Sequence, residues 1–87
     1  MAAPAIVALP ANTWAKVATN VTGGIIIVQS PATLSYIQKT YVATGSAAPT
    51  NMTAAVPVRS YETTINVAAA IDVYYYSSVA GSVLVAI

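Results

Sequence analysis

The sequence predicts an all-β protein, a small antiparallel β-sandwich or jelly-roll-like barrel of six or seven short strands with an extended N-terminal arm. β-Branched and aromatic residues gather in short runs, turn-forming residues separate these runs roughly every ten residues, and no long 3.6-residue helical period is present. Because the chain has 87 residues, we expect one domain, residues 13–87, preceded by the arm, residues 1–12.

The N-terminal quarter of the chain is expected to contain the arm, one strand and one turn. Pro4 and Pro10 disfavour a helix and favour extended backbone over residues 1–12. Residues 13–18 are expected to form a strand, with Trp14, Lys16 and Ala18 on one side and Ala15 and Val17 on the other. Residues 19–24, Thr-Asn-Val-Thr-Gly-Gly, supply turn chemistry because both glycines can adopt positive φ.

The central segments alternate between strands and connections. Residues 25–29 form a β-branched run without alternation, which indicates a strand buried on both faces. A turn is expected over residues 30–32, and a longer strand over residues 33–42. The apolar phase of that strand changes near Ile37, which favours a bulge or two differently buried faces. Residues 43–53 are rich in small and polar residues and predict a loop.

The C-terminal segments begin with a weak strand. Residues 54–59 are expected to form a short edge strand or an irregular segment, because Pro57 cannot donate to a ladder. The rest is expected to comprise a turn over residues 60–64, a short strand or loop over 65–70, a strand over 71–78, a hairpin turn over 79–82 and a last strand over 83–87.

Composition and charge exclude several classes of function. The net charge is +1, which gives no electrostatic basis for nucleic-acid binding. The apolar runs are interrupted well before the roughly 20 residues of a membrane-spanning helix, so we expect no membrane insertion. The start of the chain has no basic residue and contains two prolines, so it does not predict a signal peptide. Cysteine and histidine are absent, which excludes disulfides and thiolate metal sites, and no cofactor is expected.

Catalytic chemistry has few candidate residues: Lys16, Lys39, Arg59, Glu62 and Asp72. A Glu62/Asp72 pair could in principle serve a glycosidase. The simpler interpretation places Glu62 in a solvated turn and Asp72 on a strand face. A serine or threonine nucleophile would have only a lysine as its base. We therefore expect no enzyme activity.

Partner subunits are the expected source of additional stability. Size scaling predicts roughly 4,800 Å² of folded surface and burial of about 63% of the unfolded surface, which makes a lone domain marginal. Only 6% of the residues are charged, and the mean hydropathy is +0.72. The candidate interface comprises Ile6, Val7, Leu9, Trp14, Tyr74 and Tyr76. Core packing is the alternative for Trp14, and core packing or sugar stacking is the alternative for the tyrosines.

Several motifs in order also suggest a family: Trp14, Val21-Thr22-Gly23-Gly24, Ile27-Val28-Gln29-Ser30, Gly45, Ala48-Pro49-Thr50, Asp72-Val73-Tyr74 and Ala80-Gly81-Ser82-Val83-Leu84-Val85. In this order the chain resembles small virion proteins of tailed bacteriophages, namely capsid decoration or cement proteins and related modules of head and tail fibres. It departs from that pattern at residues 59–64, where Ser60-Tyr61-Glu62 replaces a glycine-containing turn, and at residues 68–70, which lack a glycine.

The resemblance implies a β-sandwich or jelly-roll-like module that assembles, often as a homotrimer, on the outer surface of an icosahedral capsid. The expected function is to decorate and stabilise this capsid by binding the major capsid protein and further copies of the chain. The arm would add a strand to a sheet edge of a capsid subunit. The alternatives are a fibre or tail component that binds a cell-surface glycan through Tyr74 and Tyr76, and a minor capsid or head–tail joining component.

Overall fold

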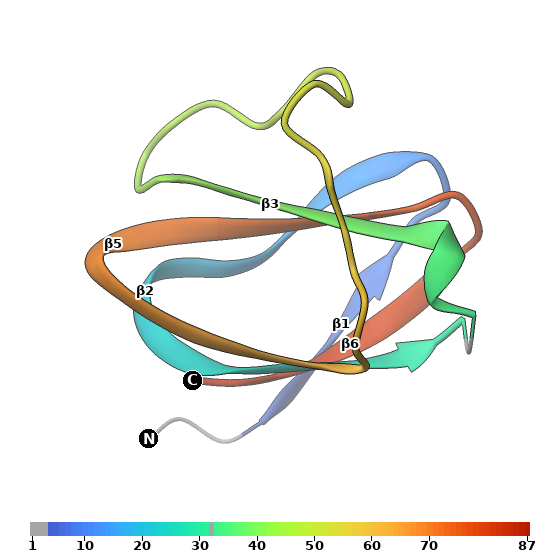
Figure 1. The fold of residues 1–87 in the computed structure, drawn as a ribbon, viewed down its shortest axis with the longest axis horizontal. Helices are drawn as coiled ribbons and strands as arrows, with labels where there is room; N and C mark the ends of the chain where they lie inside the picture. Colours follow the sequence, from blue (N-terminus) through green and yellow to red (C-terminus); the bar gives the residue numbers. More distant parts are fainter. Residues whose placement is uncertain (1–3, 32) are drawn as a thin grey trace.

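Six strands form one antiparallel sheet in the computed structural model, which describes residues 4–31 and 33–87 (Figure 1). The all-β prediction is confirmed. The order in the sheet is β1-β6-β2-β5-β3-β4. The strands are β1 (Ala5–Leu9), β2 (Thr13–Ser30), β3 (Ile37–Ala43), β4 (Val56–Pro57), β5 (Glu62–Ser77) and β6 (Gly81–Ala86).

The sheet becomes a sandwich because its two longest strands, β2 and β5, belong to both layers. Thr13 at the start of β2 pairs with Ser77 at the end of β5, and Ile27 near the end of β2 pairs with Glu62 at the start of β5. β3 and β4 extend the first of these pairings, and β6 and β1 extend the second. The first layer comprises β4, β3, the first half of β2 and the second half of β5. The second layer comprises the second half of β2, the first half of β5, β6 and β1 (Figure 1).

The bend in β2 falls on residues 19–24, where the sequence predicts a turn. That prediction is wrong, because the chain continues in the same strand. Register shifts lie between Ala18 and Val21 and between Val21 and Gly23, and Asn20 has a φ of 55°. Extra residues bulge out of the ladder and increase its local bend while pairing resumes on either side. Two expected strands, residues 13–18 and 25–29, are therefore one.

β5 bends opposite β2 and is also continuous, so the turn expected over residues 60–64 ends where Glu62 begins the strand. Ile71 pairs with Val21 and Asn66 pairs with Gly23, which leaves residues 67–70 opposite Thr22 alone. This stretch contains the alanine run that the sequence left open between strand and loop. It is strand, and its small side chains suit the outside of a tight bend.

The segment before β3 differs from the single strand expected over residues 33–42. A 3₁₀ turn, Leu34–Tyr36, precedes β3, with the Tyr36 N–H donating to the Thr33 carbonyl at 3.4 Å. The apolar phase changes near Ile37 because this turn ends there, not because of a bulge. The expected loop and the edge strand containing Pro57 are present. The hairpin expected over residues 79–82 is wrong, because β5 and β6 do not pair with each other. Residues 78–80 instead connect the end of β5, which pairs with β3, to β6, which pairs with β1 and β2. Ala32, in the expected turn over residues 30–32, lies outside the described residues.

Part of the predicted arm belongs to the domain. Ala5–Leu9 forms β1, in which Ile6 pairs with Leu84 and Leu9 pairs with Gly81 of β6. Leu9 is only 1% exposed and packs in the core, so this segment gains more from burial than it would as a free arm. Residues 1–3 of the predicted arm lie outside the described residues.

The core fills the space between the two layers. Its buried residues come from both layers and include Leu9, Val17, Val21, Ile26, Val28, Ile37, Val58, Ile65, Val73, Tyr75, Val83 and Val85. Complete burial of one such aliphatic side chain contributes roughly 1.5–3 kcal/mol. The accessible surface is 4748 Å², close to the area expected from chain mass.

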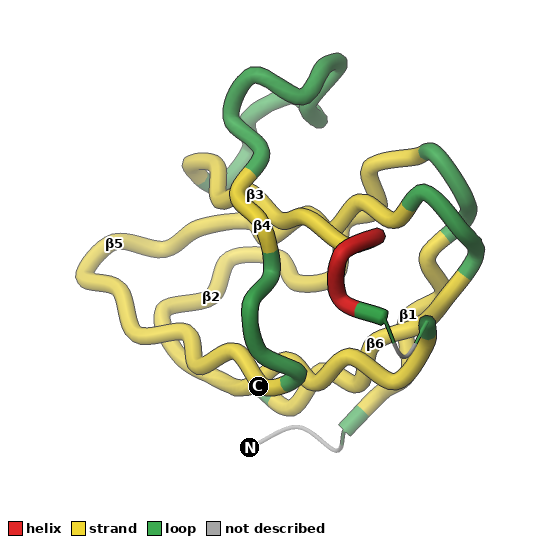
Figure 2. Tube along the Cα trace, turned by 45° about the vertical axis from the view of Figure 1, so that its right-hand side comes forward, coloured by secondary structure: helices red, strands yellow, loops and turns green. Residues whose placement is uncertain are grey.

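One side of the sandwich is closed by the segment between β4 and β5, which crosses from the first layer to the second (Figure 1). The Val58 N–H donates to the Ile37 carbonyl at 3.2 Å, and the Val28 N–H donates to the Tyr61 carbonyl at 2.7 Å. The segment is therefore hydrogen-bonded to both layers. The loop between β3 and β4, in contrast, projects beyond the first layer (Figure 2).

Gly81→Ala is expected to destabilise the protein by about 1–3 kcal/mol, because a Cβ at Gly81 would overlap the backbone of Ser30. The matched control is Gly23→Ala, whose Cβ would meet the Ile65 carbonyl at an ordinary 3.6 Å. This control is expected to change stability by no more than about 0.5 kcal/mol. Urea unfolding followed by circular dichroism measures both. Equal losses in the two variants would contradict the packing of β6 against the end of β2.

Tyr75→Phe is expected to leave stability unchanged or to raise it by up to about 1 kcal/mol. The Tyr75 side chain is buried in the core, and its hydroxyl has no hydrogen-bond partner of normal geometry among the described residues. Burial raises the pKa of this hydroxyl, and the nearby Thr63 side chain only partly opposes that rise. Tyr75→Ala, which leaves a cavity, is expected to cost about 3–5 kcal/mol. A comparable loss in Tyr75→Phe would show that the hydroxyl is bonded.

Candidate protein interface

Asp72 lies buried, 1% exposed, at the corner where β2 and β5 bend. Its carboxylate accepts hydrogen bonds from the backbone N–H of Asn20 at 2.9 Å and of Gly45 at 3.2 Å. The Lys16 Nζ lies 3.5 Å from its Oδ2. The Asn20 hydrogen bond is the largest cause of the lowered pKa of Asp72, and it outweighs burial. The Asp72 carboxylate in turn raises the pKa of Lys16.

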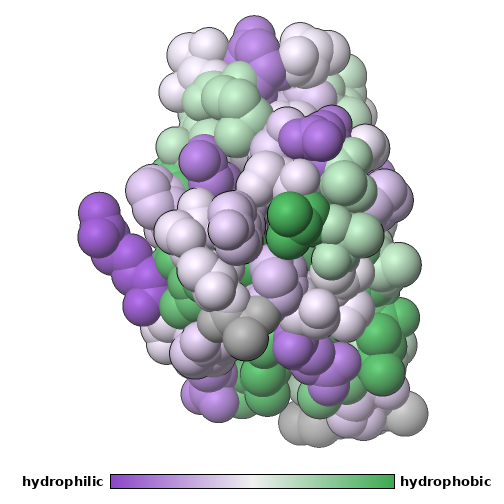
Figure 3. Space-filling model, turned by 90° about the vertical axis from the view of Figure 1, so that its right-hand side faces the viewer, coloured by the Kyte–Doolittle hydropathy of each residue, from purple (hydrophilic) through white to green (hydrophobic). Residues whose placement is uncertain are grey.

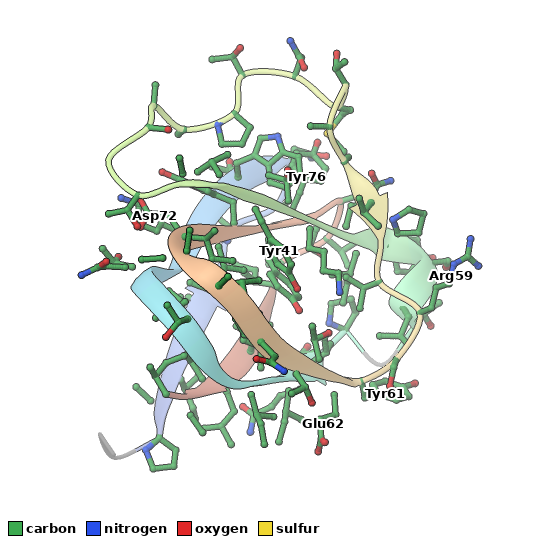
Figure 4. All side chains as sticks on the ribbon, turned by 60° about the vertical axis from the view of Figure 1, so that its left-hand side comes forward. Tyr41, Arg59, Tyr61, Glu62, Asp72 and Tyr76 are labelled. Carbon is green, nitrogen blue, oxygen red and sulfur yellow. The ribbon has the colours of Figure 1, made fainter. Side chains whose placement is uncertain are left out.

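This arrangement gives Asp72 a structural role. Three partners already surround its carboxylate, and Glu62 lies away from it at the start of β5 (Figure 4). Arg59 points outward from the crossing segment, away from both carboxylates (Figure 4). Within the described residues there is no group of three or more potential metal-ligating acidic, histidine or cysteine side chains. The same part of the chain contains no helix with the length and apolar character needed to cross a membrane.

Trp14 and Tyr76 form a half-buried aromatic pair on the first layer, from paired positions of β2 and β5. Their ring centroids are 5.4 Å apart, with the planes tilted by 56°. The Trp14 Nε1–H donates to the Asn51 carbonyl at 3.1 Å, which holds the projecting loop against β2. The Tyr76 hydroxyl donates to the Asn12 side-chain oxygen at 3.3 Å, which holds the connection between β1 and β2. The aromatic pair therefore fixes both the projecting loop and the β1–β2 connection to the first layer, and one side of the pair stays accessible.

The six residues predicted for an interface do not form one surface. Leu9 and Tyr74 are buried, at 1% and 4% exposure, within the chain itself. Tyr74 lies beneath Lys16, whose Nζ is 5.7 Å from the ring centroid. Val7 is half-buried beside the core, whereas Ile6 is 66% exposed. The accessible members are therefore Ile6 on β1 in the second layer, and the Trp14–Tyr76 pair in the first.

Sequence reasoning missed a second apolar region at the opposite edge of the sheet. Tyr41 on β3 and Val56 on β4 are exposed, and with Lys39 and Thr40 they line a shallow open cavity of about 120 Å³. The Lys39 Nζ lies 5.7 Å from the Tyr41 ring centroid. Burial lowers the pKa of Lys39 and raises that of Tyr41. Pro57 was the available signal, because a proline-bearing edge strand leaves its neighbours uncovered.

The remaining surface is neither strongly charged nor strongly apolar. All five charged residues lie in the described part of the chain, and Asp72 is buried. The accessible surface of 4748 Å² therefore carries only four charged side chains. Figure 3 shows a face dominated by weakly polar residues, with isolated strongly apolar and strongly polar side chains between them. Further exposed apolar side chains are Tyr36, Met52, Tyr61 and Val79.

Comparisons with known proteins found no family model, no curated protein and no solved structure that matches this chain.

Asp72→Asn is expected to lower the melting temperature at neutral pH, since the neutral amide is a weaker acceptor for Asn20 and Gly45. The folded-state pKa of Asp72 is below its ordinary value of 3.8, so its contribution is complete above that pH. As pH falls below 3.8, the contribution is lost and the two proteins should converge. Thermal melts between pH 7 and pH 2, followed by circular dichroism, measure this.

The matched control for this measurement is Glu62→Gln, because Glu62 is exposed at the start of β5. An exposed carboxylate contributes little to stability, so the melting temperature should hardly change. A difference between the native protein and Asp72→Asn that stayed constant down to pH 2 would contradict the assigned role of the charge.

Proposed function

We propose that this chain is a structural virion protein that decorates and stabilises an icosahedral phage capsid from its outer surface. It binds the major capsid protein and other copies of itself. The observation that carries the proposal is the surface, where four charged side chains accompany large exposed apolar ones. Soluble domains have about 25% charged residues, which keep them apart in solution. A surface this poor in charge suits a protein that spends its working life against other subunits.

The position of the apolar side chains supports a bridging role. Ile6 lies on β1 at one end of the strand order, and Tyr41 and Val56 lie on β3 and β4 at the other end. Two separate contact regions on one rigid sandwich allow the chain to touch two neighbours at once. Stabilising a shell requires this, because a subunit with one contact region can coat a surface but cannot connect its parts.

Binding of a cell-surface glycan is the second candidate, and the half-buried Trp14–Tyr76 pair is the observation that favours it. Aromatic rings with nearby amides are common in sites for small polar ligands. The expected Tyr74–Tyr76 platform does not form, because Tyr74 is buried. The polar groups of Trp14 and Tyr76 already bond to Asn51 and Asn12. The capsid proposal is therefore preferred.

The test is co-sedimentation of the purified chain with capsids of the virus whose genome encodes it. We expect saturable binding and a higher temperature of genome release from decorated capsids. Tyr41→Asp combined with Val56→Asp should reduce occupancy, because it places charge in the apolar edge region. Thr22→Asp, at an exposed polar position on the bend of β2, should bind like the native chain.

Two outcomes would contradict the capsid proposal. One is the absence of binding to capsids at any chain concentration. The other is a native copy number on the order of a dozen per particle, which is typical of a joining position on a symmetry axis. Glycan-array binding that is lost in Trp14→Ala, together with no capsid binding, would establish the second candidate instead.

A further inference from the structure

β1 forms one edge of the sheet, and among the described residues no strand pairs with its outer side. β1 is the terminal strand of the sheet, and β6 is the one strand with which it pairs in the described part of the chain. Its sequence, Ala-Ile-Val-Ala-Leu, carries no charge, and Ile6 is the most exposed large apolar side chain of the described part. Pro4 and Pro10 stand at its two ends. Since proline has no N–H, the open edge is limited to the five residues between them.

The opposite edge of the sheet is protected in a way that β1 is not. β4 has only two residues, Val56–Pro57, and Pro57 removes a backbone donor. Short edge strands, prolines and lysines are the usual means by which proteins prevent strand pairing between molecules. β1 is longer, with five residues, and contains neither proline nor lysine. The two edges therefore differ in kind, and β1 is the one that can accept a strand.

We propose that β1 pairs antiparallel with β1 of a second copy, across a two-fold axis at Val7. In this register Ile6 faces the partner's Ala8, Ala5 faces the partner's Leu9, and Val7 faces its equivalent. Every large side chain other than the central valine meets a small one. Side chains directly opposite each other lie about 4.5–5.5 Å apart, so a large–small pair fills the space without a clash.

Other registers fit this edge less well. A shift by one residue would place the core-facing Val7 beside the outward-facing Ile6, because side chains alternate between the faces of a strand. A shift by two residues would leave part of each strand opposite a proline. The register centred on Val7 uses all five residues of both strands and keeps the outer faces of the two sheets continuous.

The contact is expected to be weak between free chains and effective between chains held close together. Five residues form only a few backbone hydrogen bonds, each with a small net contribution, and association costs translational freedom. Chains already bound side by side have a high effective concentration, which removes much of that cost. The pairing does not depend on what holds the chains. The β1–β1 pairing produces dimers, whereas the resemblance implies trimers.

The absence of cysteine allows a register-specific test. Ile6→Cys and Ala8→Cys chains, one of them isotopically labelled, are mixed and oxidised with copper phenanthroline in air. Each disulfide joins two thiols, and oxygen accepts their electrons and protons. The mixed disulfide should dominate, because its two cysteines face each other. Like cysteines would be diagonal neighbours, about 7–8 Å apart. Mass spectrometry separates the products.

Thr22→Cys is the control for random collision, because Thr22 is exposed on the bend of β2, away from β1. It should give little dimer under the same conditions. The proposal is overturned if like disulfides match the mixed one in yield, or if the Thr22→Cys chain cross-links as readily.

A second measurement avoids covalent chemistry. Sedimentation equilibrium at high chain concentration should show a dimer that Ile6→Lys weakens by about tenfold or more, because a charge on the edge opposes pairing. Val56→Lys, at the exposed opposite edge, should dimerise like the native chain. The reverse result, or a native chain that stays monomeric at every concentration, would overturn the proposal. Capsid binding is measured separately, so either proposal can fail alone.

Discussion

The corner at which β2 and β5 bend depends on one buried carboxylate. The bulges of β2 release the Asn20 N–H from the ladder, and the chain leaving β3 presents the Gly45 N–H at the same place. Buried donors without acceptors are costly, and Asp72 accepts from both. Because both long strands turn here, one sheet becomes two layers. The core between the layers, and the separation of the two sheet edges, follow from that bend.

Local sequence predicts which residues are extended more reliably than where the chain reverses. The β-branched run at residues 25–29 and the edge position of Pro57 follow from properties of the residues themselves. Residues 79–82 have the composition of a hairpin turn, yet the strands on either side of them pair with other strands. Residues 19–24 have the composition of a reversing turn, yet they kink a continuous strand. The outcome depends on β5 bending alongside, some fifty residues later in the chain. Residues 68–70 are strand for the same non-local reason, despite their weak propensity.

Two of the six residues predicted for an interface, Leu9 and Tyr74, are buried within the chain for a related reason. Alternation along β5 correctly places Tyr74 and Tyr76 on one face, because that depends only on strand geometry. It cannot reveal that Lys16, from the neighbouring strand, lies over Tyr74 while Tyr76 keeps an open side. The sequence predicts the same role for Leu9 and Ile6, but the pairing of β1 with β6 turns Leu9 inward and Ile6 outward. Sequence identifies shared faces, and only the fold determines which faces are covered.

An unprotected apolar edge requires an explanation in any small β protein, because such edges promote open-ended aggregation. In this chain the lysines lie on β2 and β3, not on β1, so the edge is not blunted by charge. When β1 pairs with β1 of a second copy, the open edge of each chain is covered by the other. The outer edges of the resulting pair would both be β4, where Pro57 prevents further extension. A two-fold contact of this kind is closed, so the same geometry that allows one partner excludes a fibre.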